Sequence, residues 1–128
     1  MQFVRAGWDT ELQLRPDRSL AHVIAVTTDS RGCTEREAAE AVTAVVRRLR
    51  EVGITHVYKK IDSTLRGHVR AEVQAVMDSW SPHAIAVVCP AFPANHRTVV
   101  DGQLRVNGVP VAETAAGTDP VTPVRETR

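Results

Sequence analysis

The chain has 128 residues, of which 43% are hydrophobic and 24% are charged, and its formal net charge is +1. This length suits one domain of ordinary size, so we do not expect a multidomain enzyme that carries all its own parts. The nearly neutral balance argues against nucleic acid or a membrane surface as a partner held through bulk charge, so a bound anion should be small and held locally.

The first helix is predicted over residues 34–52. Thr34 and Glu37 have the spacing of a capping box, and Gly53 is placed to end the helix. Apolar residues recur at intervals of three and four along it, which predicts one buried stripe. That stripe consists of Ala38, Ala41, Val42, Val45, Leu49 and Val52.

A second helix is predicted over residues 65–80, with Ser63 or Thr64 as its cap and Ser81-Pro82 ending it. Its apolar face is expected to hold five residues, namely Val69, Val73, Val76, Met77 and Trp80. The charged residues Arg70, Glu72 and Asp78 are expected to point away from that face.

Four β-branched segments, 12–14, 22–27, 56–61 and 84–89, are predicted strands. Their alternation with helices predicts an α/β fold, a three-layer and mostly parallel Rossmann-like sheet with helices on both faces. Asp101-Gly102 and Asn107-Gly108 are turn dipeptides, so a small antiparallel excursion is expected over 98–111.

We divide the chain into a domain over residues 1–113 and a linker or arm over 114–128. The second part is rich in Thr, Pro, Gly and charge and has no hydrophobic period, so we expect it to need a partner to become ordered. The cysteines, Cys33 and Cys89, stand far apart and in no metal-ligand spacing. We therefore expect no disulfide, no metal site and a cytoplasmic protein. No apolar run approaches the roughly 18 residues of a membrane span.

Polar clusters follow three of the predicted strands, at 28–32, 62–67 and 90–97. In a parallel sheet, ligands bind at the carboxyl ends of the strands, where these clusters would meet. Residues 62–67 combine a carboxylate, two hydroxyls and a guanidinium with expected helix amides, which suits an anion or a polyol. The alternative is a simple helix cap beside a solvated arginine.

The other candidates also have structural alternatives. Residues 28–32 are equally a favourable loop sequence, and 90–97 could be a rigid strand exit. Lys59 and Lys60 point to opposite faces of a strand, and the sequence does not decide which of them reaches the site. Neither GxxxxGK[ST] nor GxGxxG after a strand occurs, so no phosphate cradle for a nucleotide is predicted.

Taken together, four strings resemble the N-terminal sugar-binding domain of the four-carbon acid sugar kinases: YKKIDSTLRG at 58–67, CPAFP at 89–93, TVVDG at 98–102 and VNGVP at 106–110. The resemblance implies an ATP-dependent kinase that phosphorylates a tetronate such as erythronate, threonate or 3-oxo-tetronate. It implies that a separate C-terminal domain binds ATP and Mg²⁺, and that this chain has no cofactor-binding residues. A homodimer is a further possibility.

The resemblance implies a substrate site and one catalytic candidate, Asp62. Arg66 with the helix amides suits the acid's carboxylate, whereas Asp62 and Asp29 suit its hydroxyls. The candidate substrate-binding residues are Asp29, Ser30, Arg31, Lys60, Asp62, Ser63, Arg66, Gly67, Asn95 and Arg97.

Two departures from the family pattern bear on the site. The family begins with a strand and an Asp-Asp-Leu-Thr-Gly-Ala-like loop, whereas this sequence starts inside the following helix, so the main catalytic carboxylate is expected upstream of Met1. His96 stands where the family usually has glycine, and it either adopts a left-handed conformation or reshapes the loop. The chain alone is expected not to turn over; the alternatives are a non-catalytic module that binds sugar acids or anions, or an inactive fragment.

Overall fold

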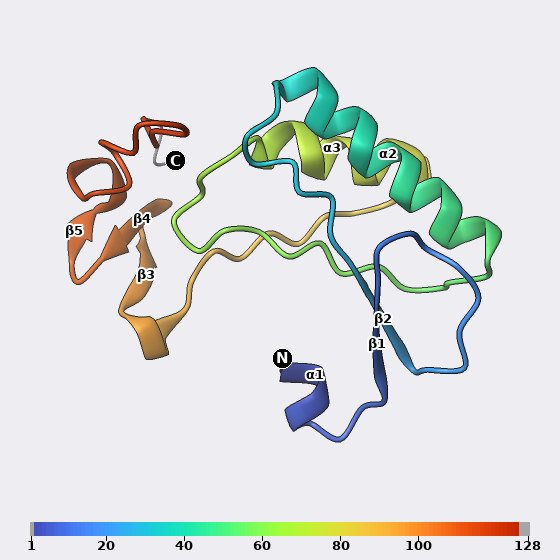
Figure 1. The fold of residues 1–128 in the computed structure, drawn as a ribbon. Helices are drawn as coiled ribbons and strands as arrows, with labels where there is room; N and C mark the ends of the chain where they lie inside the picture. Colours follow the sequence, from blue (N-terminus) through green and yellow to red (C-terminus); the bar gives the residue numbers. More distant parts are fainter. Residues whose placement is uncertain (1, 126–128) are drawn as a thin grey trace.

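A computed structural model describes residues 2–125 of the chain. Two small sheets and a pair of long helices make up the fold (Figure 1). Strands β1 and β2 are parallel and pair Thr10 with Val23 and Gln13 with Val26. Strands β3, β4 and β5 form an antiparallel sheet in that order. The elements are α1 (Gln2–Arg5), β1 (Thr10–Gln13), β2 (Val23–Val26), α2 (Glu35–Glu51), α3 (Val69–Trp80), β3 (Arg97–Val100), β4 (Gln103–Val106) and β5 (Val109–Pro110), with 3₁₀ turns at Pro93–Asn95 and Val111–Glu113.

Helix α2 confirms the predicted first helix, including its ends. The Thr34 side chain accepts a hydrogen bond from the Glu37 amide, and the Glu37 side chain accepts one from the Thr34 amide, so the capping box is complete. Of the predicted stripe, Ala38, Val42 and Leu49 are buried, whereas Ala41, Val45 and Val52 are only partly buried. Val46, which was not predicted, is buried with them. Val42 and Val46 pack on Ala75 of α3 and form one of the two apolar cores.

Helix α3 begins four residues later than predicted. Leu65 and Gly67 have φ values of +61° and +91°, which no α-helix can include, so residues 62–67 form a turn and His68 becomes the N-cap. Ser63 and Thr64 therefore do not cap the helix. The predicted orientation is confirmed in part, since Arg70 and Asp78 are exposed and Val76 and Trp80 pack against the core shared with α2. It was wrong for Glu72, which is buried together with Ala75 and Ser79.

The predicted strands at 56–61 and 84–89 are absent. Both segments cross the molecule as chain without regular secondary structure (Figure 1). Within residues 2–125, the segments 55–61 and 85–91 make no backbone-to-backbone hydrogen bond. Tyr58, Ile85 and Val87 are largely exposed. A strand forms only where a neighbouring strand supplies matching backbone donors and acceptors. The β-branched composition alone therefore predicted two strands that do not form.

The fold class is therefore mixed α/β, with a two-stranded parallel sheet and a separate three-stranded antiparallel one. A continuous three-layer sheet is not formed by the described residues. None of the helices described between residues 2 and 125 is long and apolar enough to cross a membrane.

The antiparallel sheet confirms the excursion predicted over 98–111. Asp101 and Gly102 join β3 to β4, and Asn107 and Gly108 join β4 to β5. All four residues have positive φ, as a two-residue type I′ hairpin turn requires. The sheet carries the second apolar core, in which Leu104 and Val111 are almost fully buried.

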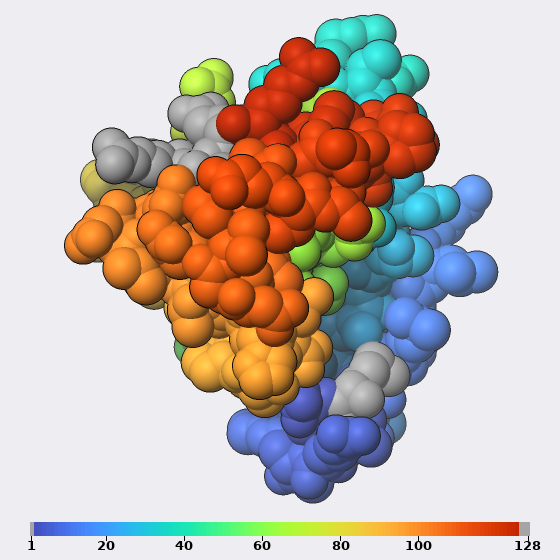
Figure 2. All heavy atoms as spheres, turned by 90° about the vertical axis from the view of Figure 1, so that its left-hand side faces the viewer, coloured from blue at the N-terminus to red at the C-terminus, as the bar shows by residue number. Residues whose placement is uncertain are grey.

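The segment 114–125 packs on this second core and is ordered by the chain itself. Val124 is buried with Leu104 and Val111, and its amide donates to the Ala116 carbonyl. Gly117 passes so close to Ala112 that a Cβ there would lie 1.8 Å from the Ala112 carbonyl oxygen. Figure 2 shows this segment lying against the green atoms of the turn region. Residues 126–128 of the predicted linker, and Met1, lie outside the described residues.

Candidate functional site

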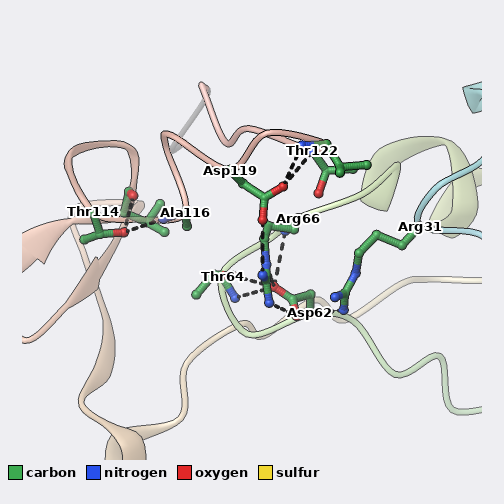
Figure 3. A network of polar contacts seen from close by, with 10 residues as sticks. Arg31, Asp62, Thr64, Arg66, Thr114, Ala116, Asp119 and Thr122 are labelled. Atoms are coloured by element: carbon green, nitrogen blue, oxygen red, sulfur yellow. Dashed lines mark hydrogen bonds and ion pairs between the residues drawn. The ribbon is translucent and has the colours of Figure 1, made fainter.

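Asp62 is the centre of a network of charged side chains from three parts of the chain, which we call the Asp62 cluster (Figure 3). Arg66 binds both carboxylate oxygens, with Nε 3.1 Å from Oδ2 and Nη2 3.3 Å from Oδ1. Arg31 approaches from the loop after β2, with Nη2 3.1 Å from Oδ1. The cluster consists of Arg31, Asp62, Thr64, Arg66 and Asp119.

The turn at 62–67 builds this geometry locally. The amides of Thr64 and Arg66 and the Thr64 hydroxyl all donate to Asp62 Oδ2. Leu65 packs against the second apolar core, which anchors the turn to the antiparallel sheet. Gly67 supplies the φ of +91° that ends the turn, and a Cβ at this position would lie 3.6 Å from Cγ of Arg31. Apolar packing and glycine thus place Asp62 and Arg66 face to face.

Asp62 is ionised in this setting. Partial burial opposes ionisation, but hydrogen bonds from Arg66 and Thr64 outweigh it and hold the pKa of the Asp62 carboxyl well below its ordinary value. The same contacts raise the pKa of the Arg66 guanidinium. Both groups therefore keep their charges throughout the physiological pH range.

Arg66 also reaches the C-terminal segment. Its Nη1 lies 3.4 Å from Oδ2 of Asp119. The other Asp119 oxygen accepts from the amides of Val121 and Thr122, and these bonds lower the pKa of the Asp119 carboxyl. A continuous chain of contacts therefore runs from Asp62 through Arg66 to the backbone at 121–122.

A second polar network connects the loop after β2 with α3. Lys59 Nζ lies 2.5 Å from Oε2 of Glu72, and the Ser30 hydroxyl donates to Oε1 of the same carboxylate at 2.6 Å. Thr28 Oγ1 lies 3.0 Å from Ser30 Oγ. Lys59 thus turns toward α3. Ser30, a predicted substrate-binding residue, is buried, and its hydroxyl proton is already donated.

The structure brings together only some of the predicted site residues. Arg31, Asp62, Arg66 and Gly67 meet at the turn. Asp29 is exposed with a φ of +46°, and Lys60 is exposed on the chain beside Lys59. Among the described residues, no hydrogen bond or ion pair joins Asp29, Lys60, Ser63, Asn95 or Arg97 to the Asp62 cluster.

The third polar cluster forms its own local structure. His96 adopts the left-handed conformation with φ 55° and ψ 30°, the first of the two predicted outcomes. Arg97 begins β3 and donates to the Asn95 carbonyl, while its Nε is buried without a partner. These residues adjoin the antiparallel sheet, whereas the Asp62 cluster lies at the turn before α3.

A cavity of about 330 Å³ lies beside the Asp62 cluster. We call it the Arg31 cavity. Its walls come from the loop after β2, the turn before α3 and the C-terminal segment, namely Arg31, Gly32, Cys33, Leu65, Gly67, His68, Val121, Thr122 and Pro123. A second cavity of about 350 Å³ is lined by Arg18, Ser19, Leu20, Ile24, Val52 and Ile54, and no residue of the Asp62 cluster lines it.

Sequence reasoning missed Glu72 and Asp119 as members of these networks, whereas it left the choice between Lys59 and Lys60 open and included the Thr64 hydroxyl in the 62–67 cluster. For Glu72 a signal existed, since Ala75 and Ser79 follow it at helical spacing and are small enough for close helix packing. For Asp119 the signal was Asp119-Pro120, which favours a turn held by the aspartate side chain. Neither signal identifies the distant partner.

No group of three or more His, Cys, Asp or Glu side chains within residues 2–125 is arranged to hold a metal ion. The carboxylates of the Asp62 cluster are paired with arginines, which leaves them poor ligands for Mg²⁺.

Comparisons with known proteins agree on one family. A family described as the sugar-binding N-terminal domain matches residues 1–128. A D-threonate kinase of Bordetella bronchiseptica is 51% identical over 98% of this chain, and a D-erythronate kinase of Heliobacterium modesticaldum is 40% identical over 82%. The chain spans 33% and 24% of the length of these two relatives.

A solved structure is also similar to this chain. A domain from Bordetella bronchiseptica, crystallised with bound citrate as a domain-swapped dimer, superimposes with a TM-score of 0.93 at 51% identity. The match covers 98% of this chain and 33% of that one.

Proposed function

Because the chain belongs to the family of sugar-binding N-terminal domains, we propose that it binds the substrate of a kinase that phosphorylates a four-carbon sugar acid. The observation that carries this proposal is the family match over residues 1–128, together with relatives named for D-threonate and D-erythronate. The kinase names favour this function over a non-catalytic binding module or an inactive fragment.

The Asp62 cluster and the Arg31 cavity are the proposed binding site. A sugar acid presents one carboxylate and several hydroxyls, so it needs cationic donors at one end and acceptors along its chain. Arg31 at the cavity supplies a cationic donor for the carboxylate, and the ionised Asp62 supplies an acceptor for a hydroxyl. The citrate bound by the structural relative is likewise a small anion that carries carboxylate and hydroxyl groups.

ATP with Mg²⁺ is the proposed phosphoryl donor, held outside residues 2–125 by a C-terminal nucleotide-binding domain. Asp62 can accept a hydrogen bond from the attacking hydroxyl and orient it, which is the contribution of a protein carboxylate to such a transfer. Its strong pairing with two arginines makes it a poor proton acceptor, so we assign it positioning rather than proton removal. A homodimer and a cytoplasmic location remain predictions.

The test is a calorimetric titration of the chain with D-threonate and D-erythronate, followed by an ATP-coupled assay. We expect saturable binding of at least one acid and no phosphorylation, because the sequence has no GxxxxGK[ST] or GxGxxG motif and we assign the nucleotide to a separate domain. Absence of binding for both acids would contradict the proposed function. Phosphorylation by this chain alone would contradict the proposed location of the nucleotide site.

A further inference from the structure

Glu72 is a buried carboxylate near the N-terminal end of α3 that no step of the proposed function uses. It is 8% exposed. Lys59 Nζ lies 2.5 Å from its Oε2, and the Ser30 hydroxyl donates to its Oε1 at 2.6 Å. Removing a carboxylate from water is costly, and a buried ion pair is often no more stabilising than apolar side chains of similar size. Stability alone therefore gives little reason for a glutamate at this position.

The two partners of Glu72 belong to the two segments that carry the proposed ligand-binding residues. Ser30 directly precedes Arg31 in the loop after β2, and Lys59 stands three residues before Asp62. Among the backbone hydrogen bonds of the described residues, none joins one of these segments to the other. Their relative position therefore depends on side chains.

Among the described side chains, two links join these segments, and a ligand affects them differently. The first is the ion pair of Arg31 and Asp62 beside the Arg31 cavity, in which the Arg31 side chain is 53% exposed. A ligand that binds either group competes with this pair. The second link is made by Ser30, Lys59 and Glu72, none of which lines the cavity. An incoming ligand therefore leaves the second link intact.

Helix α3 is a firm support for the second link. It shares an apolar core with α2 through Ala75. Its N-cap residue, His68, places Nε2 2.7 Å from the Cys33 carbonyl oxygen at the end of the loop after β2. Figure 1 shows this loop reaching the start of α3. Glu72 thus ties both segments to a packed helix, which suits a group that must hold binding residues in place.

We propose that Glu72 is a positioning residue that holds the loop after β2 through Ser30 and the segment before the 62–67 turn through Lys59. Glu72 thereby sets the distance between the two sides of the sugar-acid site. This role rests on the proposed function of that site. Glu72 does not touch the ligand, and Ser30 acts by holding its loop and not as a substrate contact.

The experiment is a calorimetric titration with D-threonate and D-erythronate, at a temperature where circular dichroism shows each variant folded. Glu72→Ala should weaken binding by roughly 10- to 100-fold, the range known for residues that orient metal-binding side chains. Ser30→Ala and Lys59→Gln should each weaken binding less. Adding either change to Glu72→Ala should cause no further loss, because the link is already broken. Additive losses would show that Ser30 or Lys59 contacts the ligand directly, and would overturn the role of Glu72.

Hydrogen exchange separates positioning from a merely stabilising role. In Glu72→Ala, the amides of residues 28–33 and 59–62 should exchange faster, while those of α2 keep their wild-type rates. Asp78→Asn is the matched control, because that exposed carboxylate of the same helix accepts from Gln74. Val42→Ala, in the core between α2 and α3, is the control for lost stability. Both controls should leave the affinity of the folded chain unchanged.

Wild-type affinity in folded Glu72→Ala, or an equal loss of affinity in Val42→Ala, would overturn the positioning role and leave the proposed function intact. Failure of the wild type to bind either acid would instead overturn the proposed function itself. Should Glu72→Ala be unfolded, Glu72→Gln is measured in its place. It keeps an acceptor for Ser30 but loses the charge that holds Lys59, so a weakened affinity supports the proposal and an unchanged one contradicts it.

Discussion

At the scale of single residues, the site depends on backbone conformations that side chains rarely adopt. Asp29, Leu65 and His96 all have positive φ without being glycine. All three lie in the polar clusters that the sequence indicated as binding elements, and Leu65 belongs to the turn that holds Asp62. Such conformations persist only where the surrounding contacts compensate for their cost.

His96 allows this cost to be measured. His96→Gly should raise the free energy of unfolding by about 0.5–1 kcal/mol, because the left-handed penalty of a side chain exceeds the extra chain entropy of glycine. Urea unfolding is the measurement. The control is His83→Gly, at an exposed turn position without positive φ, where glycine should be neutral or destabilising. Equal effects at the two positions would show that His96 is not strained.

Protonation of Asp62 makes the free energy of unfolding of the chain depend on pH in the acid range. Its pKa is lower in the folded chain than its ordinary value of 3.8, so its contribution to stability is complete above 3.8 and is lost as the pH falls toward the folded value. Asp62→Asn should cost about 1.5–3 kcal/mol near pH 6, and its difference from the wild type should shrink below pH 3.8.

Urea unfolding at a series of pH values tests this expectation. Asp17→Asn is the control, because that carboxylate is 74% exposed and pairs with a half-exposed Arg48. An exposed ion pair of this kind contributes little to the free energy of unfolding. A difference between Asp62→Asn and the wild type that stays constant from pH 6 to pH 3 would contradict the prediction.

At the scale of elements, the structure separates those that form through local contacts from those that need a distant partner. Helix α2 and the two hairpin turns match the prediction, because their caps and turn residues lie within a few positions of one another. Segments 56–61 and 84–89 have strand-like composition and no strand partner among residues 2–125. Their apolar side chains are consequently exposed.

This difference predicts how two apolar truncations will behave. Ile85→Ala should change the free energy of unfolding by less than about 0.5 kcal/mol, because that side chain is 89% exposed. Val42→Ala should cost about 1.5–3 kcal/mol, because Val42 is 2% exposed in the core between α2 and α3. A large loss of stability in Ile85→Ala would reveal that the 84–89 segment is buried in solution.

At the scale of the whole molecule, two small apolar cores are joined through the turn at 62–67. Val42, Val46 and Ala75 form one core, and Leu104, Val111 and Val124 form the other. The turn inserts Leu65 beside the second core and continues into α3, which belongs to the first. The Asp62 cluster and the Arg31 cavity occupy this junction, so the geometry of the proposed binding site depends on how the two halves pack.

The sequence by itself determined the family, helix α2, the antiparallel excursion and the grouping of Asp62, Arg66 and Gly67 in one short segment. These follow from short motifs, whose residues interact within a turn or two of chain. Only the tertiary structure decided the start of α3, the pairing of Glu72 with Lys59 and the contact between Arg66 and Asp119. Those contacts join residues that are separated in sequence, and packing of Leu65 and Val124 in the second core brings the turn of Arg66 beside the segment of Asp119. Local sequence patterns indicate which polar side chains need a hydrogen-bond or ion-pair partner, whereas tertiary packing determines which residue that partner is.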